Sequence, residues 1–393
     1  MPETNTQGEF APEHQAMIDA AAGWFRDIDA AEILRRDAAH TPVYEFLPRL
    51  AELGLMRAFI PEAHGGLAVP WSVYCRIQEV LAYRYQAIAA ILNRVMCFGV
   101  LPLIRFGTAS QQARLLPPLL DGKALTALAL SEPAAGSDAR AVQTRAERAP
   151  SGWRVRGRKT WISDADQATH LQTLCRLATE RPRRFITLLV PRHAQGVSMT
   201  LIPKLGNHYM PSYDIAYDDV FVSDDDVLGV ADQGFDCVTA TLKFSRTSLS
   251  AMLLGSANAV LDIAIHHARE REQFGQPLTE FQVIRHKLVD MRIEIEKARR
   301  IVYEFARLVD ANEDTTTVGA IAKIAASEMF QFVTDQGMQI LASAGYSTAS
   351  LMQMHWRNAR LYSFGEGSNE IQREIIGRDM GLRNTQRGLG TGG

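Results

Sequence analysis

A helical segment, a β-rich segment and a second helical segment follow one another along this chain of 393 residues, which predicts a multidomain α+β fold. Apolar residues recur every three or four positions in the first third. Short β-rich pieces separated by Gly, Pro and Asp fill the middle third, and a long amphipathic helical pattern dominates the last third.

The composition is that of an ordinary globular protein. With 47% apolar and 22% charged residues, the chain is long enough to bury more than one core. The formal net charge of -2 leaves no surplus positive charge for a phosphate backbone or an anionic membrane, so we expect no nucleic-acid partner and no membrane insertion. The four cysteines fit neither a metal site nor a disulfide framework, and the amino terminus carries no export signal, so we expect a cytoplasmic protein.

Residues 11–123 are expected to form an amino-terminal helical domain. The pieces FLPRLAELGLMRAFI and IQEVLAYRYQAIAAIL show the helical spacing. The longest apolar run, Ala87–Ile104, is interrupted by Asn93 and Arg94 and so falls short of a clean membrane span. We interpret it as a buried helix.

Residues 124–233 are expected to form an antiparallel β-domain. The β-rich pieces are WRVRGRKTWIS, RFITLLVP, VSMTLI and IAYDDVFV.

Residues 234–383 are expected to form a helical bundle. From residue 281 to 309 one apolar seam alternates spacings of four and three, as in helices that pack at a shallow angle: Ile284, Leu288, Met291, Ile295, Ala298, Val302, Phe305 and Val309. Thr279 and Gln282 have the spacing of a capping box that could start this helix. Further helices are expected around 248–272 and 318–341. Residues 384–393 contain a GxGxxG spacing with no strand before it, and we expect a flexible tail there.

A glycine-containing loop, ALSEPAAGSDARA at 129–141, is the first segment that could carry chemistry. Ser131, Gly136 and Ser137 offer small side chains, hydroxyl groups and backbone N–H groups that can cradle a pyrophosphate. Taken alone, the segment is explained better as a turn.

The second segment is RKTWISD at 158–164. If it is a strand, Trp161 and Ser163 point to one face and Ile162 to the other. An indole and a hydroxyl on one face suit a flavin, although a tryptophan on a strand is usually part of a core.

The third segment is FGEGSNEIQ at 364–372. Glu366 lies between two glycines and outside the helical pattern, whereas Glu370 and Glu374 belong to a helix that Ser368 or Asn369 would cap. A carboxylate on such a loop is a plausible general base, although a solvated loop glutamate is the commoner case.

These three segments, in this order, resemble the acyl-CoA dehydrogenase family. The resemblance runs from about residue 11 to 382 and includes FGTASQQARLLPPLLDGK, KTWIS, YDDVFVSDDDVLG and REQFGQPLTEFQ. It implies an amino-terminal helical domain, a central β-barrel and a carboxyl-terminal four-helix bundle, assembled as a homotetramer.

The resemblance also implies FAD as the cofactor. Leu130, Ser131, Gly136 and Ser137 would contact the flavin and pyrophosphate, while Trp161 and Ser163 would pack against and hydrogen-bond the isoalloxazine. From a neighbouring subunit, Arg271, Phe274 and Gln339 would reach the ADP portion, where a guanidinium can bind pyrophosphate through two parallel hydrogen bonds.

The implied reaction is the α,β-desaturation of an acyl thioester, carried on CoA or on an acyl carrier protein. Glu366 would remove the α-proton while the β-hydrogen leaves as hydride to flavin N5. A flavin hydroxyl and the N–H of Glu366 would stabilise the thioester oxygen. An electron-transfer flavoprotein would then accept the electrons.

The chain departs from the family pattern at several positions. Gly365 stands where an aromatic residue usually precedes the base, and Ala342 and Ser343 replace a glycine pair. Asp164 replaces an asparagine, and Asn358 replaces an aspartate.

Arg94, Arg246, Gly365 and Gly367 are candidate substrate contacts. Arg94 lies in an otherwise apolar helix, and a buried arginine needs a partner. That partner could be a polar or carboxylated acyl tail, or it could be a structural ion pair.

Two other functions fit the same residues. One is a flavin-dependent monooxygenase or oxidase on the same fold, which Glu366 argues against because such enzymes do not need the carboxylate. The other is a non-catalytic binding paralogue.

Overall fold

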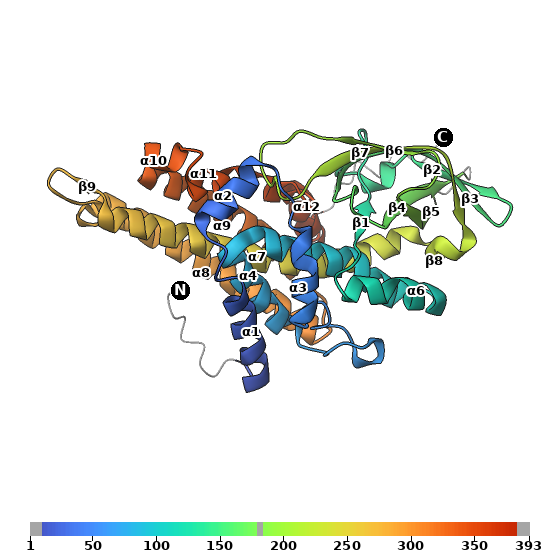
Figure 1. The fold of residues 1–393 in the computed structure, drawn as a ribbon, viewed down its shortest axis with the longest axis horizontal. Helices are drawn as coiled ribbons and strands as arrows, with labels where there is room; N and C mark the ends of the chain where they lie inside the picture. Colours follow the sequence, from blue (N-terminus) through green and yellow to red (C-terminus); the bar gives the residue numbers. More distant parts are fainter. Residues whose placement is uncertain (1–9, 179–183, 383–393) are drawn as a thin grey trace.

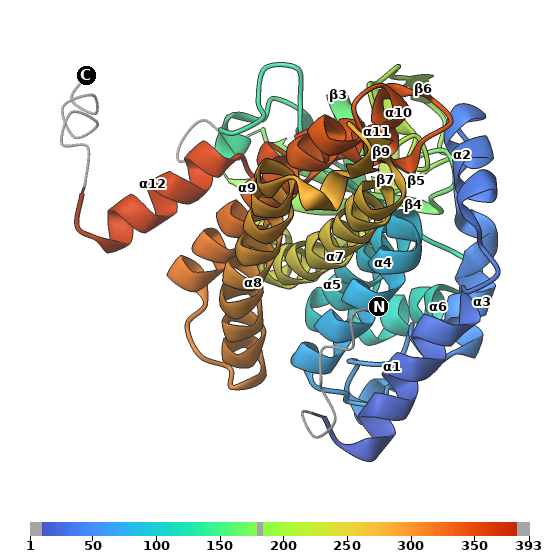
Figure 2. The same ribbon diagram turned by 90° about the vertical axis from the view of Figure 1, so that its left-hand side faces the viewer.

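The computed structural model describes residues 10–178 and 184–382. Figure 1 shows a long helical body with a β-sheet at one end, and Figure 2 views the same chain from its helical end. The α, β, α order predicted from the sequence is confirmed. The predicted tail at 384–393 and the amino terminus up to residue 9 lie outside the described residues.

The amino-terminal region is helical. Its α-helices are α1 Pro12–Trp24, α2 Ala30–Ala38, α3 Leu47–Glu52, α4 Trp71–Val95, α5 Leu101–Phe106 and α6 Ala109–Leu120. A capping box starts α6, in which the Thr108 hydroxyl accepts from the N–H of Gln111 and the Gln111 side chain accepts from the N–H of Thr108.

Helix α4 is the buried helix predicted from the long apolar run. It bends at Tyr85, whose φ of -152° and ψ of 107° are not helical, and it continues through a π-turn at Met96–Val100 into α5. Two stretches, Trp71–Phe106 and Gly234–Glu270, are long and apolar enough to cross a membrane by length and composition. Their most apolar windows are 89% and 72% buried inside the protein, so both behave as core helices.

The middle region forms an eight-stranded sheet. Its strands are β1 Thr126–Ala129, β2 Arg145–Ala149, β3 Gly152–Ser163, β4 His170–Leu177, β5 Phe185–Pro191, β6 Val197–Leu201, β7 Ser212–Ser223 and β8 Val227–Asp232.

The expected closed, antiparallel barrel is not observed. The strands follow the open path β6-β7-β3-β2-β4-β5-β8, and β1 pairs with β4 off that path. A barrel closes only if its two edge strands pair, and within the described residues β6 and β8 share no register. Both β1 and β2 also run parallel to β4, so the sheet is mixed.

The carboxyl-terminal region contains three long helices, followed by shorter ones. The helices are α7 Gly234–Glu270, α8 Gln282–Asp310, α9 Thr316–Leu341, α10 Ser343–Tyr346, α11 Leu351–Ala359 and α12 Asn369–Asp379, and the hairpin β9 Glu272–Gln273 and β10 Gln276–Pro277 joins α7 to α8. The predicted seam of α8 is buried from Met291 to Phe305. The predicted capping box is wrong: Phe281 is the N-cap and makes no side-chain cap, because a short 3₁₀ turn at Leu278–Glu280 precedes the helix.

Close packing of α4 on α7 joins the two helical regions. A Cβ at Gly255 of α7 would lie 2.0 Å from the carbonyl oxygen of Glu79, so only glycine allows this approach. The buried Glu79 carboxylate also pairs with Arg299 of α8 at 2.6 Å and accepts from the Tyr303 hydroxyl at 2.9 Å. Helix α4 therefore serves as a structural part of the bundle.

The end of α9 carries backbone strain that predicts the effect of a substitution. Ala342 has φ 50° and ψ -130°, a conformation that costs a non-glycine residue about 1–3 kcal/mol. We expect Ala342→Gly to stabilise the protein by about 1 kcal/mol after the greater entropy of the unfolded chain is counted. The measurement is the thermal unfolding midpoint. The control is Ala344→Gly, which replaces a residue inside α10 and should lower the midpoint. An equal loss in both variants would contradict the expectation.

Candidate active site

Glu366 lies on a glycine-flanked loop between a 3₁₀ turn at Arg360–Ser363 and helix α12. Its φ of 55° is in the left-handed region, and the φ of Gly367 is 92°. The Ser368 hydroxyl accepts from the N–H of Ile371 at 3.3 Å and caps α12, so Ser368 is the cap among the two predicted residues. The loop position of Glu366 is therefore as predicted.

Two side chains hold the backbone of this loop. Arg246 Nε donates to the carbonyl oxygen of Glu366 at 3.1 Å, and Gln372 Nε2 donates to the carbonyl oxygen of Gly367 at 3.3 Å. The φ of Gly367 is one that L side chains rarely adopt, so the held conformation favours glycine there. Such restraint is what keeps a strained residue in place.

The carboxylate of Glu366 is held on one side. The Ser245 hydroxyl of α7 donates to Glu366 Oε2 at 2.7 Å, and Asn93 Nδ2 of α4 donates to Ser245 Oγ at 3.1 Å. From the residues that the structure describes, no hydrogen bond to Oε1 is recorded. We did not single out Ser245 or Asn93 for this role from the sequence, because no spacing connects positions 93, 245 and 366.

The surroundings of Glu366 favour its protonated form. Burial raises the pKa of Glu366 above its ordinary value of 4.5, because an ionised carboxylate is less stable away from water. The Ser245 hydrogen bond and the positive charges of Arg246, Lys323 and Arg94 lower the pKa only in part. Lys323 is itself fully buried, and burial lowers its pKa to about 8.

Arg94 forms a buried ion pair with Asp164. Arg94 Nε contacts Asp164 Oδ2, and the Tyr44 hydroxyl donates to Asp164 Oδ1 at 2.9 Å. Arg94 Nη2 is buried and has no hydrogen-bond partner among the residues that the structure describes. Because Asp164 directly follows Ser163, this ion pair links strand β3 to α4, and Asn93 continues the link to Ser245 and Glu366.

Strand β3 presents Trp161 at a bulge. Lys159 pairs with Ile215 and Ile162 with Tyr213, so β3 has one residue more than β7 between these pairs. Trp161 has φ 60° there and is 57% exposed, whereas Ile162 is buried and Ser163 is half-buried. This burial agrees with the predicted faces, but the bulge was not predicted.

A buried ion pair joins the loop at 129–141 to the same strand. Lys159 Nζ donates to Glu132 Oε1 at 2.8 Å and to the carbonyl oxygen of Leu130 at 2.9 Å. The N–H of Thr160 donates to the carbonyl oxygen of Ser131 at 2.9 Å. These contacts bring the predicted loop beside the Trp161 bulge, while Gly136 and Ser137 remain exposed.

The predicted residues Arg271, Phe274 and Gln339 lie elsewhere. Phe274 is 94% exposed on the β9–β10 hairpin, and Arg271 and Gln339 are exposed as well. Figure 1 shows this hairpin at the end of the helical body opposite the β-sheet. Within one chain these residues therefore do not join the site at Trp161 and Glu366.

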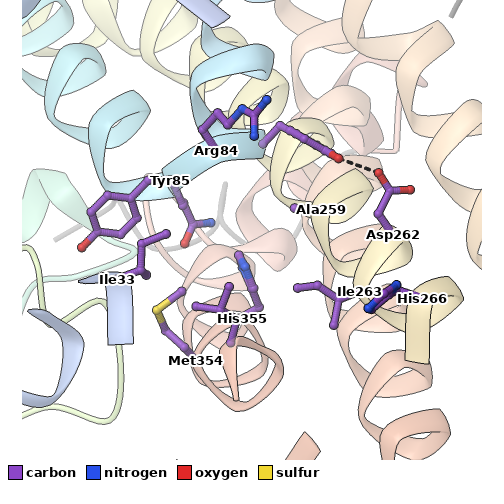
Figure 3. A pocket seen from close by; sticks show the side chains of 12 residues that line it. Ile33, Arg84, Tyr85, Ala259, Asp262, Ile263, His266, Met354 and His355 are labelled. Atoms are coloured by element: carbon purple, nitrogen blue, oxygen red, sulfur yellow. Dashed lines mark hydrogen bonds between the residues drawn. The ribbon is translucent and has the colours of Figure 1, made fainter. Parts of the chain in front are cut away.

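A separate cavity of about 320 Å³ opens between α2, α4, α7 and α11 (Figure 3). The Tyr83 hydroxyl donates to Asp262 in its lining, and within 10–178 and 184–382 Gln86 and His355 each keep one buried nitrogen without a partner. Burial lowers the pKa of His355 to about 4. Neither Glu366 nor Trp161 lines this cavity, so it lies apart from the candidate site.

Comparisons with known proteins give one consistent family. Three family models match consecutive parts of the chain: the acyl-CoA dehydrogenase N-terminal domain at 11–123, the middle domain at 127–220 and the C-terminal domain at 232–381. The chain is also 30% identical to the mouse mitochondrial short-chain specific acyl-CoA dehydrogenase over 370 residues, which is 93% of this chain and 89% of the mouse protein.

Two solved structures extend the likeness to three dimensions. Butyryl-CoA dehydrogenase from Megasphaera elsdenii superposes with a TM-score of 0.89 at 29% identity, covering 95% of this chain and 99% of that one. A chain from the structure described as the electron transferring flavoprotein of Acidaminococcus fermentans superposes with a TM-score of 0.88 at 27% identity, with the same coverage.

The raised pKa of Glu366 predicts a pH-dependent effect on stability. A carboxyl whose pKa is higher in the folded state loses stabilisation as pH rises from 4.5 through the folded value. We therefore expect Glu366→Gln to raise the thermal unfolding midpoint at pH 8, by an amount that shrinks towards pH 4.5.

The matched control is Glu374→Gln, which removes the same charge from an exposed site on α12. A midpoint difference between Glu366→Gln and wild type that stays constant from pH 4.5 to 8 would refute this account of the Glu366 environment.

Proposed function

This chain belongs to the acyl-CoA dehydrogenase family of FAD-dependent oxidoreductases, and we propose that Glu366 is the base that removes the α-proton of its acyl-CoA substrate. The observation that carries the proposal is the Glu366 carboxylate, with Oε2 held by Ser245 and Oε1 left free to accept a proton. A base with a raised pKa also binds the abstracted proton more tightly.

The residues of the β-domain fit FAD. The bulge at Trp161 leaves a large aromatic side chain exposed, which is costly unless a flat partner covers it. Beside it, the loop at 129–141 offers Gly136, where a Cβ would meet nothing within 4 Å, and the exposed Ser137. We propose that Leu130, Ser131, Gly136 and Ser137 contact the flavin and pyrophosphate, and that Trp161 and Ser163 contact the isoalloxazine.

Glu366 contributes to the reaction in two ways. Its ionised Oε1 takes the α-proton. For its backbone N–H no acceptor is recorded among the described residues, so this group is free to donate to the thioester oxygen as negative charge develops there. Such a donor contributes roughly 3 kcal/mol in comparable sites. When bound, FAD accepts the β-hydride, and the product is a trans-2-enoyl thioester.

Gly365 and Gly367 leave the sides of this loop without side chains, and we propose that the acyl group approaches there. Arg246 acts in this proposal by anchoring the carbonyl oxygen of Glu366. A monooxygenase or oxidase on the same fold does not need the Glu366 carboxylate that Ser245 holds. A non-catalytic paralogue does not need that carboxylate to be buried. Both alternatives therefore fit the site less well than the dehydrogenase.

We further propose that the protein works as a homotetramer. Arg271 and Phe274 are exposed at the hairpin opposite the chain's own β-sheet, and Gln339 is exposed near the carboxyl end of α9, as residues that reach the ADP portion of a neighbour's FAD need to be. An electron-transfer flavoprotein is the proposed electron acceptor, in keeping with the Acidaminococcus match.

The four cysteines are free and buried, which suits the proposed cytoplasmic location. The proposed domain boundaries remain 11–123, 124–233 and 234–383.

The base is tested by Glu366→Gln. Anaerobic addition of acyl-CoAs should bleach the flavin absorbance of the wild-type protein. The variant should retain bound flavin but reduce it at least roughly 10³-fold more slowly, because an amide cannot accept the proton. Bleaching of the variant at the wild-type rate would exclude Glu366 as the base. A protein that cannot be reconstituted with FAD would exclude the enzyme altogether.

The role of Ser245 is tested by a pH profile. Its hydrogen bond lowers the pKa of Glu366, so Ser245→Ala should raise that pKa further. Because Glu366 must be ionised to act, the acid limb of the kcat/KM profile should move to higher pH, with activity lost on the acid side and recovered as the pH rises. Ser245→Thr keeps the hydroxyl and serves as the control. An equal shift in both variants would mean that packing, and not the hydrogen bond, sets the pKa.

A further inference from the structure

The cavity between α2, α4, α7 and α11 opens at the break in α4 (Figure 3). Four consecutive residues of α4, from Tyr83 to Gln86, line it, although consecutive residues of an unbroken helix point in different directions. Tyr85 is extended, so the helix starts again after it, and residues 86–95 form a segment of ten residues. The first N–H groups of such a segment have no acceptor in a preceding turn and carry the positive end of its dipole. The cavity therefore meets a helix amino terminus.

The hydrogen-bond network fixes which atom of the Gln86 side chain is free. The N–H of Asn207 donates to Asn358 Oδ1 at 2.6 Å, so Asn358 uses Nδ2 to donate to Gln86 Oε1 at 3.2 Å. Gln86 Oε1 is thereby occupied, and Gln86 Nε2 is a buried donor without an acceptor in the part of the chain that the structure describes. Gln86 is 1% exposed and lines the cavity, so the cavity wall holds an unsatisfied donor of fixed orientation.

His355 lies beside Gln86 in the same cavity. It precedes Asn358 by three residues on α11, and residues three apart on a helix are neighbours on one face. The contact of Asn358 with Gln86 therefore brings the Gln86 amide close to the His355 ring. His355 is 5% exposed, and its Nδ1 has no partner within the described ranges. Two neighbouring polar side chains of one cavity thus lack partners.

The charged side chains of the lining balance one another. Asp262 accepts from the Tyr83 hydroxyl at 2.6 Å, and Arg84 is an exposed cation for which no ion pair is recorded among the described residues. His266 pairs with Glu270 at 3.1 Å. With these charges opposed, the helix amino terminus and the free amide donor decide which ligand the cavity prefers. Both call for an oxygen acceptor, and negative charge on that oxygen strengthens both interactions. An ammonium group would leave the amide donor unsatisfied.

We infer that this cavity binds the carboxylate of a small organic acid, with one carboxylate oxygen accepting from Gln86 Nε2. A carboxylate has about four lone-pair sites, so it can also accept from an N–H of the His355 ring and from a backbone N–H at the start of the helical segment. The apolar body of the acid packs on the apolar part of the lining, which includes Ile263, Leu351 and Met354.

The experiment measures binding to the full-length, FAD-loaded protein at pH 7 by titration calorimetry. Glu366 does not line this cavity, so the test needs no turnover. The probes are straight-chain carboxylates of four, six and eight carbons, with the primary amide and the amine of each length. We expect one carboxylate to bind per chain, at least tenfold more tightly than the amide of the same length, because charge-assisted hydrogen bonds are the stronger ones.

Three results with the wild-type protein would overturn the inference. An amide that binds as tightly as its acid would show that charge is not recognised, and a preference for the amine would show that the cavity selects a cation. If no carboxylate binds saturably, water alone fills the cavity.

The donor is tested by Gln86→Met, which keeps a side chain of similar length and should weaken carboxylate binding at least tenfold. Gln78→Met is the matched control, because Gln78 is also a fully buried amide of α4 with one unpartnered atom but does not line the cavity. It should keep the wild-type affinity. Equal affinities in the two variants would overturn the inference.

A second variant tests the cavity without touching its polar groups. Ala259→Met fills it from α7 and should abolish carboxylate binding, even if Gln86→Met does not fold. A thermal unfolding curve shows that each variant is folded. Wild-type affinity in folded Ala259→Met would mean that the acid binds elsewhere, which would also overturn the inference.

Discussion

The cost of burying charge governs how this molecule is assembled. Three buried charges find their partners in different parts of the chain: Arg94 of α4 in Asp164 beyond β3, Lys159 of β3 in Glu132 of the preceding loop, and Glu79 of α4 in Arg299 of α8. An unpaired buried charge is far more costly than a lost apolar contact, so these pairs tolerate little displacement. They fix the positions of α4, the sheet and the bundle relative to one another. The positions of the site residues follow from this arrangement.

The candidate base is a compromise between opposing demands. Burial destabilises its ionised form, whereas a serine hydroxyl and three cations stabilise that form in part. Its backbone is strained, and Arg246 and Gln372 hold the strained loop in place. The folded protein is therefore less stable because it holds a carboxylate that is poorly solvated but able to ionise. Active sites commonly lower the stability of the fold that carries them.

Features encoded by local pattern were predictable from the sequence. Periodicity reports which residues turn inward, so the three regions, the buried α4 and the seam of α8 were predictable, as were the loop position of Glu366 and the Ser368 cap. Pairing between distant residues leaves no such pattern. The open sheet, the bulge at Trp161 and the Phe281 cap depend on which strand or turn lies alongside. Likewise, Asp164 as the partner of Arg94, and Asn93 and Ser245 behind Glu366, are contacts across 70 to 152 residues of sequence.

The hairpin at the far end of the bundle has a genetic consequence. With Arg271 and Phe274 opposite the chain's own sheet, the proposed assembly builds each cofactor site from two chains. A lesion at Arg271 then damages the neighbour's site and spares the carrier's own base, while a lesion at Glu366 does the reverse. Two inactive alleles of these kinds would produce some complete sites when co-expressed, so complementation between them is built into the architecture.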